Sequence, residues 1–356
     1  MILPEILAMV SVTGNQHDDY DVAQGNLLAA HGLPGAEGRN FLNDLDWIDH
    51  VAKTVRIETL RHSYQFRDNP SAFENCPAYF CMLVLATVMY QQFGVRYNPA
   101  RIRDPKFQDP YCLDPDFSDS RDLFIHGMIG GPGGTCASMP VLKAAVGRRL
   151  GYPLKLVEAK GHLFLRWDDV SGEQWRPGAR FNIEATCEGL ACPPDEHYLR
   201  WPHPMDERDL TVYGYMQPLT PPEETAMFRS TRAICLWENG NYAECLRECH
   251  WAIVLAPHRP QHCWQIMDFY KKYRAVMATK TREEVAKLAL YFEEEHAIQE
   301  NIVFGHQERL RRGRPGFNLA EFGVFTPAEF EARKQELSAL PGIITRPKVE
   351  AIPSVF

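Results

Sequence analysis

The sequence lacks the features that would place it in a membrane or on a nucleic acid. No apolar run in its 356 residues reaches the roughly 18 residues that a membrane-spanning helix requires. Asp and Glu number 46 against 38 Lys and Arg, and the net charge of −8 argues against a general nucleic-acid binder. The apolar start MILPEILAMVSV lacks the basic n-region of a signal peptide and is not followed by a convincing cleavage site. A signal peptide is therefore not expected. We therefore expect a cytoplasmic protein with neither a membrane nor a nucleic acid as partner.

The ten cysteines show no metal-binding or redox pattern. The sequence contains no C-x-x-C pair and no Cys/His spacing of the zinc-site kind. In a chain of this size such cysteines are expected to be reduced thiols that pack as small apolar side chains. Cys245 and Cys249 have the i, i+4 spacing of one helix face, which we interpret as a core face. Acidic clusters that would bind calcium are also missing, so no metal or organic cofactor is expected.

Length and composition are those of an ordinary globular protein with room for two domains. Hydrophobic residues make up 45% and charged residues 24% of the chain. The proline cluster QPLTPPEE marks a boundary near residue 217, after which the sequence becomes strongly helical. We expect an N-terminal helical arm over 1–70, a core over 71–216, a helical domain over 217–312 and a C-terminal tail over 313–356.

The predicted core consists of helices followed by a strand meander. Apolar spacing predicts helices over about 40–60 and from Pro77 onward, the second apolar nearly all round and therefore buried. A further helix opens at Cys136 and ends at Gly151. Three strand-like runs follow over 152–159, 161–169 and 179–187, and the link 170–178 is predicted to be a hairpin turn. The fold class is therefore α+β, with a helix packed on an antiparallel sheet.

Cys136 stands where a glycine-rich loop opens into this predicted helix. The first amides of a helix have no intrahelical partner, and they favour a thiolate and can bind an oxyanion. Glycine has no side chain, so it allows a substrate chain to approach closely. We assign this substrate-approach role to the residues just before Cys136 and to the glycine before His162, which are Gly133, Gly134, Thr135 and Gly161. A small buried residue is the alternative interpretation of Cys136.

A thiolate nucleophile needs a base and an orienting group for that base. His162 begins the second predicted strand, and the adjacent strand offers Asn182 and Glu184, whose two-residue spacing puts them on one face. A structural histidine and a solvated carboxylate are the alternatives for His162 and Glu184. His126 is a rival base, and its other interpretation is a hydrogen-bonding loop residue.

These motifs resemble the transglutaminase-like (papain-related) superfamily. The matching segments are G-G-T-C-A-S-M at 133–139, G-H-L-F-L-R-W-D at 161–168 and F-N-I-E-A-T at 181–186. The resemblance implies a Cys-His-Asp triad in which Cys136 is the nucleophile and His162 the base, with Glu184 in the place of the Asp. That Asp-to-Glu departure keeps Asn182 open as the papain-style alternative. The segment D-S-R-D-L-F-I-H-G at 119–127 resembles the family's approach to the nucleophile, with Asp119, Arg121 and Asp122 tying the loop together.

A second resemblance concerns residues 226–259, which are similar to one tetratricopeptide (TPR) repeat. Such repeats bind peptides or partner proteins, but one or two units also suffice to cover a catalytic core. Together the two resemblances imply a cysteine-dependent acyl transfer or hydrolysis on a peptide or protein amide. The triad does not decide between protease or amidase and transglutaminase or ligase. The alternatives are a non-catalytic transglutaminase-like/TPR interaction module and a pathway-specific acyltransferase on a small molecule.

Overall fold

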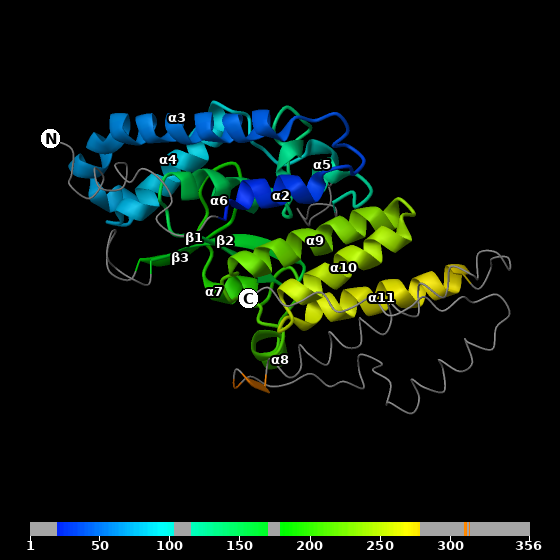
Figure 1. The fold of residues 1–356 in the computed structure, drawn as a ribbon. Coiled ribbons are helices and arrows are strands. Elements are labelled where there is room, and N and C mark those ends of the chain that lie inside the picture. Colours follow the sequence, from blue (N-terminus) through cyan, green and yellow to red (C-terminus); the bar gives the residue numbers. More distant parts are fainter. Residues whose placement is uncertain (1–19, 103–114, 170–178, 278–309, 312, 314–356) are drawn as a thin grey trace, which may run out of the picture. The chain divides into compact units, whose positions relative to one another are not determined.

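Helices and one small sheet make up the part of the chain that the computed structural model describes, residues 20–102, 115–169, 179–277, 310, 311 and 313 (Figure 1). The chain divides into two units, residues 1–256 and 257–356. The second unit contains α11 (Pro260–Met277) and the first contains the sheet. The fold is α+β, as the sequence predicts. The predicted turn over 170–178 and the predicted helices beyond residue 278 lie outside the described residues.

The helices of the first half begin where the sequence supplies a cap or a proline. Asp21 and Asn40 accept hydrogen bonds from the first turns of α2 and α3, and Pro77 opens α4. The expected helices at about 40–60 and from Pro77 are confirmed, and α4 is buried along most of its length. The elements of this half are α2 (Val22–Ala30), α3 (Phe41–Asp68), η1 (Pro70–Phe73), α4 (Pro77–Gln91), η2 (Pro99–Arg101), α5 (Ser120–Leu123) and η3 (Ile125–Gly127).

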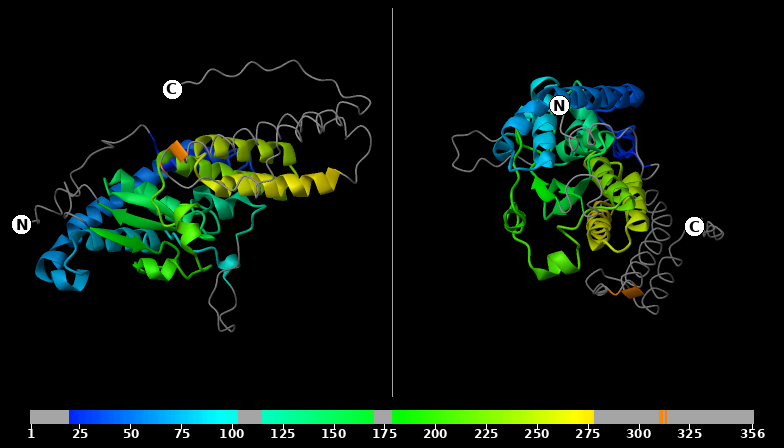
Figure 2. Two further views of the ribbon diagram at one scale, coloured as in Figure 1. Left: turned by 90° about the horizontal axis from the view of Figure 1, so that it is seen from below. Right: turned by 90° about the vertical axis from the view of Figure 1, so that its left-hand side faces the viewer.

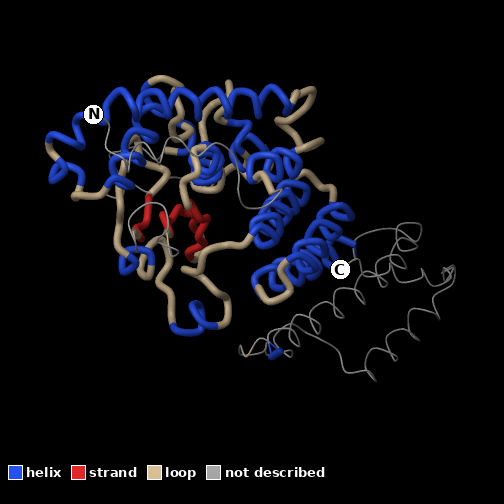
Figure 3. Tube along the Cα trace, turned by 60° about the vertical axis from the view of Figure 1, so that its left-hand side comes forward, coloured by secondary structure: helices blue, strands red, loops and turns tan. Residues whose placement is uncertain are grey.

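The sheet has three antiparallel strands in the order β1 (Leu154–Ala159), β2 (His162–Asp168) and β3 (Arg180–Ile183). Leu154 faces Trp167 across the first pair, and Arg166 faces Asn182 across the second. Because side chains alternate along a strand, the leucines and Trp167 cover one face while His162, Phe164 and Arg166 share the other. The predicted meander is confirmed, and Figure 3 shows its strands among helices.

Helix α6 (Met139–Arg149) packs on β1 and β2 and is itself covered by α2, α3 and α4. Gly147 lies so close to Leu154 that a Cβ atom there would come within 2.3 Å of the leucine side chain. Gly151 has a positive φ of 80° at the end of the helix, which is the predicted C-terminal glycine. The chain therefore turns sharply after α6, and β1 returns along the helix.

The other face of the sheet is covered by the segment that follows β3. Its core contains Phe164, Tyr198 and Met216, packed with Trp201 and Leu210. This segment carries two short helices, α7 (Asp195–Tyr198) and α8 (Glu207–Thr211). The sheet is thus buried on both sides, by α6 on one and by a loop-rich segment on the other.

Two long helices, α9 (Pro221–Glu238) and α10 (Tyr242–Leu255), pair with each other and complete the first unit (Figure 2). Arg148 of α6 donates two hydrogen bonds to the buried Glu224 of α9, the longer at 2.9 Å. Arg232 donates to the carbonyl of Ala29 at 2.8 Å. The pair matching the TPR pattern therefore belongs to the same unit as the sheet. The four predicted segments and their boundaries stay a prediction.

Two further expectations concern burial and membranes. Cys245 and Cys249 are fully buried, so the predicted core face of this helix is confirmed. Nine cysteines lie among the described residues, and these nine are thiols. In the described part of the chain, no helix combines the length and the apolar character needed to cross a membrane.

Candidate functional site

Cys136 lies in a turn just before α6 and not inside the helix. The amide of Met139 donates to the carbonyl of Thr135 at 2.9 Å, which is an α-helical contact. The next such contact would run from residue 140 to the carbonyl of Cys136, but Pro140 has no N–H to donate. The regular helix therefore begins at Met139, and the expectation that it opens at Cys136 is wrong by three residues.

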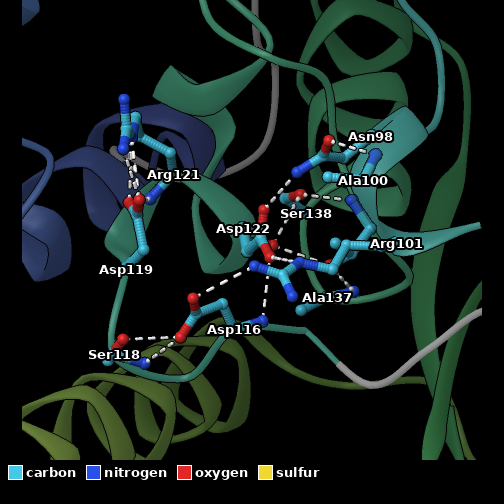
Figure 4. A network of polar contacts seen from close by, with 11 residues as sticks. Asn98, Ala100, Arg101, Asp116, Ser118, Asp119, Arg121, Asp122, Ala137 and Ser138 are labelled. Carbon is cyan, nitrogen blue, oxygen red and sulfur yellow. Dashed lines mark hydrogen bonds and ion pairs between the residues drawn. The ribbon is translucent and has the colours of Figure 1, made fainter.

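A buried carboxylate, Asp122, organises the loop that holds this turn (Figure 4). Its side chain accepts hydrogen bonds from Asn98 at 2.7 Å and from Arg101 at 2.6 Å. Its backbone carbonyl accepts one from the Thr135 hydroxyl at 2.6 Å. We call Asp122 with Asn98, Arg101 and Thr135 the Asp122 network. It ties the chain on both sides of residues 103–114 to the residue that precedes the thiol.

The predicted role of Asp119 and Arg121 is different in the structure. Arg121 pairs with Asp119 at 2.5 Å on an exposed surface, and neither side chain forms a hydrogen bond to the cysteine turn within the described part of the chain. Asp122 alone of the three acidic and basic residues holds the loop. Arg101, which the sequence did not single out, is its charged partner.

The amides around Cys136 are used within its own turn. The Thr135 amide donates to the Ser138 hydroxyl at 3.1 Å, and the Ala137 amide donates to the Thr135 hydroxyl at 3.2 Å. These contacts fix the turn, since each satisfies a donor that a helix start would otherwise leave open. The amides of Thr135 and Ala137 therefore point into the turn. Neither of these two amides is available to bind an oxyanion, the role that the sequence predicts for the first amides of the helix.

The predicted approach residues pack against the protein itself. Gly133 has φ of 129°, and a Cβ there would lie 2.9 Å from the Arg96 carbonyl, because this segment pairs with residues 96–98. A Cβ at Gly134 would lie 2.6 Å from Met139, and Thr135 is fully buried. Gly161 adopts φ of 78° beside His203. These contacts give the three glycines a packing role, and whether substrate passes them stays a prediction.

The structure brings His162 and Glu184 together. Nε2 of His162 lies 2.9 Å from Oε2 of Glu184, and both side chains are buried, 4% and 13% exposed. An imidazole beside a carboxylate places its proton on the facing nitrogen, here Nε2. The other nitrogen, Nδ1, forms no hydrogen bond to any residue that the structure describes. Nδ1 is therefore the nitrogen that can accept a proton.

Glu184 is held as an anion by a complete set of donors. Thr186 donates to Oε1 from its amide at 3.0 Å and from its hydroxyl at 2.6 Å, and the Tyr198 hydroxyl donates to Oε2 at 3.1 Å. Burial alone would raise the pKa of Glu184. The hydrogen bond and charge of His162, with the two donors of Thr186, outweigh burial and lower that pKa to about 2. The carboxylate therefore remains charged at any pH at which the protein would work.

Aromatic rings line the far side of the imidazole. Trp201 meets His162 edge to face with ring centroids 4.6 Å apart, and Tyr198 lies nearly parallel to it at 6.1 Å. Tyr198 in turn stacks on Phe164 at 3.8 Å. Packing of this kind restricts the ring of His162 to one orientation.

Connectivity places the Cys136 turn and His162 at the same end of the α6–sheet layer. Gly147 near the end of α6 touches Leu154 at the start of β1. From there, about 12 Å of helix leads back to Met139, and about 17 Å of strand leads back to Ala159. Ala159 is paired directly with His162. His162 is the first residue of β2 and shares the sheet face of Phe164.

A buried lysine lies on the same helix two turns beyond the cysteine. Lys143 is 3% exposed, and no described residue forms a hydrogen bond or an ion pair with it. Burial lowers its pKa, while the nearby groups Cys187 and Glu184 act in the opposite direction. Side chains on a helix tilt toward its N-terminus, so the ammonium is directed toward the Cys136 end.

Two alternative site residues are engaged elsewhere. Asn182 accepts from Arg166 at 2.7 Å and donates to Asp195 at 2.8 Å, so it anchors α7 and does not bind His162. His126 is fully buried and lies 3.2 Å from the hydroxyl of Ser120. Burial, together with the charge of Arg39, lowers the pKa of His126 to about 4. Both residues therefore have structural partners of their own.

The sequence does not predict three residues of this region as part of the site: Arg101, Lys143 and Tyr198. A lysine within an apolar helix pattern was a visible signal, because the other residues of that face are apolar. Tyr198 and Arg101 gave no local signal, because their contacts join segments that are distant in the sequence. No cluster of three or more His, Cys, Asp or Glu suited to a metal ion occurs in the described ranges.

Comparisons with known proteins give no family for this chain. No protein-family model, no curated protein and no solved structure matches it.

Proposed function

We propose that this protein is a cysteine-dependent acyl-transfer enzyme of transglutaminase-like fold. Cys136 is the nucleophile, His162 the base and Glu184 the group that orients the base. The substrate is an amide of a peptide or protein. The observation that carries the proposal is the buried His162–Glu184 pair at 2.9 Å, whose second imidazole nitrogen has no hydrogen-bond partner among the described residues.

The reaction follows from the assignment of the two nitrogens. Nδ1 of His162 takes the proton of the Cys136 thiol, and the resulting thiolate attacks the carbonyl carbon of the amide. The tetrahedral intermediate collapses when the imidazolium returns that proton to the leaving nitrogen. This breaks the C–N bond and leaves a thioester on Cys136. Glu184 stays ionised throughout and stabilises the imidazolium.

The second half of the reaction repeats these steps with a new acceptor. Water or an amine loses a proton to Nδ1 as it attacks the thioester carbonyl, and the cysteine leaves as thiolate and is reprotonated. Water gives a protease or amidase, and an amine gives a transglutaminase or ligase. The protein thiol and imidazole are both restored, so the cycle needs no cofactor.

Packing within the first unit supports an enzyme over a bare interaction module. The TPR-like helices α9 and α10 are joined to the core by Arg148–Glu224 and by Arg232. A helix pair fixed in this way stabilises α6 and with it the position of Cys136. The other alternative, an acyltransferase on a small molecule, uses the same chemistry and differs only in the acyl donor.

Thiol alkylation tests the nucleophile. The protein is treated with iodoacetamide at neutral pH, and the rate at each cysteine is followed by peptide mass mapping. Cys76 is the matched control because it is half-buried, as Cys136 is. We expect Cys136 to react at least about 10-fold faster than Cys76, and we expect His162→Ala to remove that difference. Equal alkylation rates at Cys136 and Cys76 would refute the proposed enzyme function and favour the alternative of a non-catalytic interaction module.

Acylation with an activated ester tests the second half of the cycle. With p-nitrophenyl acetate, we expect a burst of nitrophenolate and an acetyl adduct on Cys136, both absent from Cys136→Ala. Added ethanolamine separates the two acceptors. Formation of the acetyl amide indicates transfer, and unchanged release of acetate indicates hydrolysis.

A further inference from the structure

Tyr198 does not contact Cys136 in the proposed mechanism but binds Glu184, at the same carboxylate oxygen that His162 contacts. It is the last residue of α7, it is fully buried, and its hydroxyl donates to Oε2 of Glu184 at 3.1 Å. The same oxygen also accepts a hydrogen bond from Nε2 of His162, at 2.9 Å. Two donors from different elements therefore converge on one carboxylate oxygen.

The position of the Tyr198 ring is fixed by contacts independent of the hydroxyl. The ring stacks on Phe164 with centroids 3.8 Å apart and an angle of 7°. The start of α7 is held as well, because Asp195 accepts hydrogen bonds from Arg166 at 2.7 Å and from Asn182 at 2.8 Å. The hydroxyl is thus delivered to Glu184 from a rigid support.

The hydrogen-bond donors around Glu184 hold its carboxylate in one orientation. Thr186 supplies both donors to Oε1, so this oxygen is set by residues on the same strand end. Oε2 is set by Tyr198 and His162 from the opposite side. A glutamate side chain has one more rotatable bond than aspartate, and the tyrosine hydroxyl removes the freedom that this bond adds.

We propose that Tyr198 is a positioning residue that holds Glu184 on Nε2 of His162 and so reserves Nδ1 for the proton of Cys136. Without the hydroxyl, the carboxylate keeps its two Thr186 donors but can rotate away from the imidazole. The hold on Nε2 rests on geometry alone, whereas the role of Nδ1 rests on the proposed function.

Nuclear magnetic resonance of the His162 ring tests the hold on Nε2. The protein carries Cys136→Ala, so the readout does not depend on thiol chemistry, and the proton on Nε2 is followed by its coupling to ¹⁵N. We compare Tyr198→Phe with Tyr152→Phe, which removes another buried hydroxyl, one bound to Cys81 and Thr59. Exchange of the Nε2 proton with water is expected to be about 10-fold faster in Tyr198→Phe and unchanged in Tyr152→Phe.

Alkylation of Cys136 gives the second readout. In protein with the native cysteine, Tyr198→Phe is expected to slow the reaction about 10-fold, and Tyr152→Phe is expected to leave it unchanged. Glu184→Asp provides a second variant should Tyr198→Phe fail to fold. Its shorter carboxylate cannot reach both Thr186 and Nε2, so it should also release the Nε2 proton.

The outcomes separate the two proposals. An Nε2 proton that exchanges as slowly in Tyr198→Phe as in its parent would overturn the positioning role, whatever the reactivity of Cys136. Faster exchange together with an unreactive wild-type Cys136 would leave the positioning of Glu184 intact and refute the acyl-transfer function.

Discussion

Glu184 should make the stability of this protein depend on pH in a window that can be calculated. Its pKa is lowered from 4.5 to about 2 in the folded protein. A carboxyl group with a lower pKa in the folded state stabilises the fold above its unfolded pKa, and this contribution is lost as the pH falls toward its folded pKa. The window therefore runs from about pH 4.5 down to about pH 2.

The size of the effect follows from the two pKa values. At pH 5 almost the whole contribution of about 3 kcal/mol is present, since a difference of 2.5 units corresponds to about 1.4 kcal/mol per unit. At pH 3 the unfolded carboxyl is largely protonated while the folded one is not, and about 2 kcal/mol has been lost. Glu184→Gln has no charge to lose, so the mutant cannot show this part of the pH dependence.

The assay is urea unfolding at pH 5, 4 and 3 for the wild type and Glu184→Gln. The difference in unfolding free energy between the two proteins should shrink by about 2 kcal/mol from pH 5 to pH 3. Glu196→Gln is the control, because Glu196 is an exposed glutamate of the neighbouring helix α7. If the difference between the wild type and Glu184→Gln stays constant over this range, the His162–Glu184 pair is not formed as described.

Three further changes test the surroundings of the site. Asp122→Asn should destabilise the protein by about 3 kcal/mol and slow Cys136 alkylation, because Arg101 loses its buried partner. Asp119→Asn, which breaks only the exposed pair with Arg121, should cost less than about 1 kcal/mol in urea unfolding. Lys143→Met should raise the unfolding free energy by about 2 kcal/mol at pH 6, since burial disfavours the ammonium, and the gain should shrink toward pH 9. Exposed Lys155→Met should change little. Pro140→Ala supplies an amide for the carbonyl of Cys136, so it should lengthen α6 toward Cys136 and speed Cys136 alkylation, because the first turn of a helix favours a thiolate.

The sequence predicts the local elements of this fold well and its cross-connections poorly. The strand beginning at His162 and the helix at Pro77 follow from periodicity and proline placement, which act over a few residues. The start of α6 is misplaced because the effect of Pro140 falls on the carbonyl four residues earlier. The close contacts of Gly133 and Gly134 could not be predicted, because they depend on how separate segments of the chain pack against each other.

The candidate site shows the same division between local and distant information. Glu184 is recognisable as a partner for His162 because antiparallel neighbours in a meander meet predictably. Asn182 satisfies the same spacing rule, and only its hydrogen bonds with the buried Arg166 and with Asp195 explain why it is used elsewhere. Tyr198 could not be deduced, because its approach to Glu184 depends on how the segment after β3 folds back over the sheet.

The proline after the cysteine turn also has a mechanical consequence. A continuous helix would make Cys136 move as one body with α6, but Pro140 removes one of the backbone bonds that joins the turn to the helix. Cys136 is instead bound to the loop held by Asp122, while His162 is bound to the sheet on which α6 packs. The turn stays joined to α6 by the bonds from Met139 to Thr135 and from Leu142 to Ser138, so both the helix and the Asp122 network set the position of Cys136. On the proposed function, a change in the Asp122 network would therefore alter the separation of nucleophile and base.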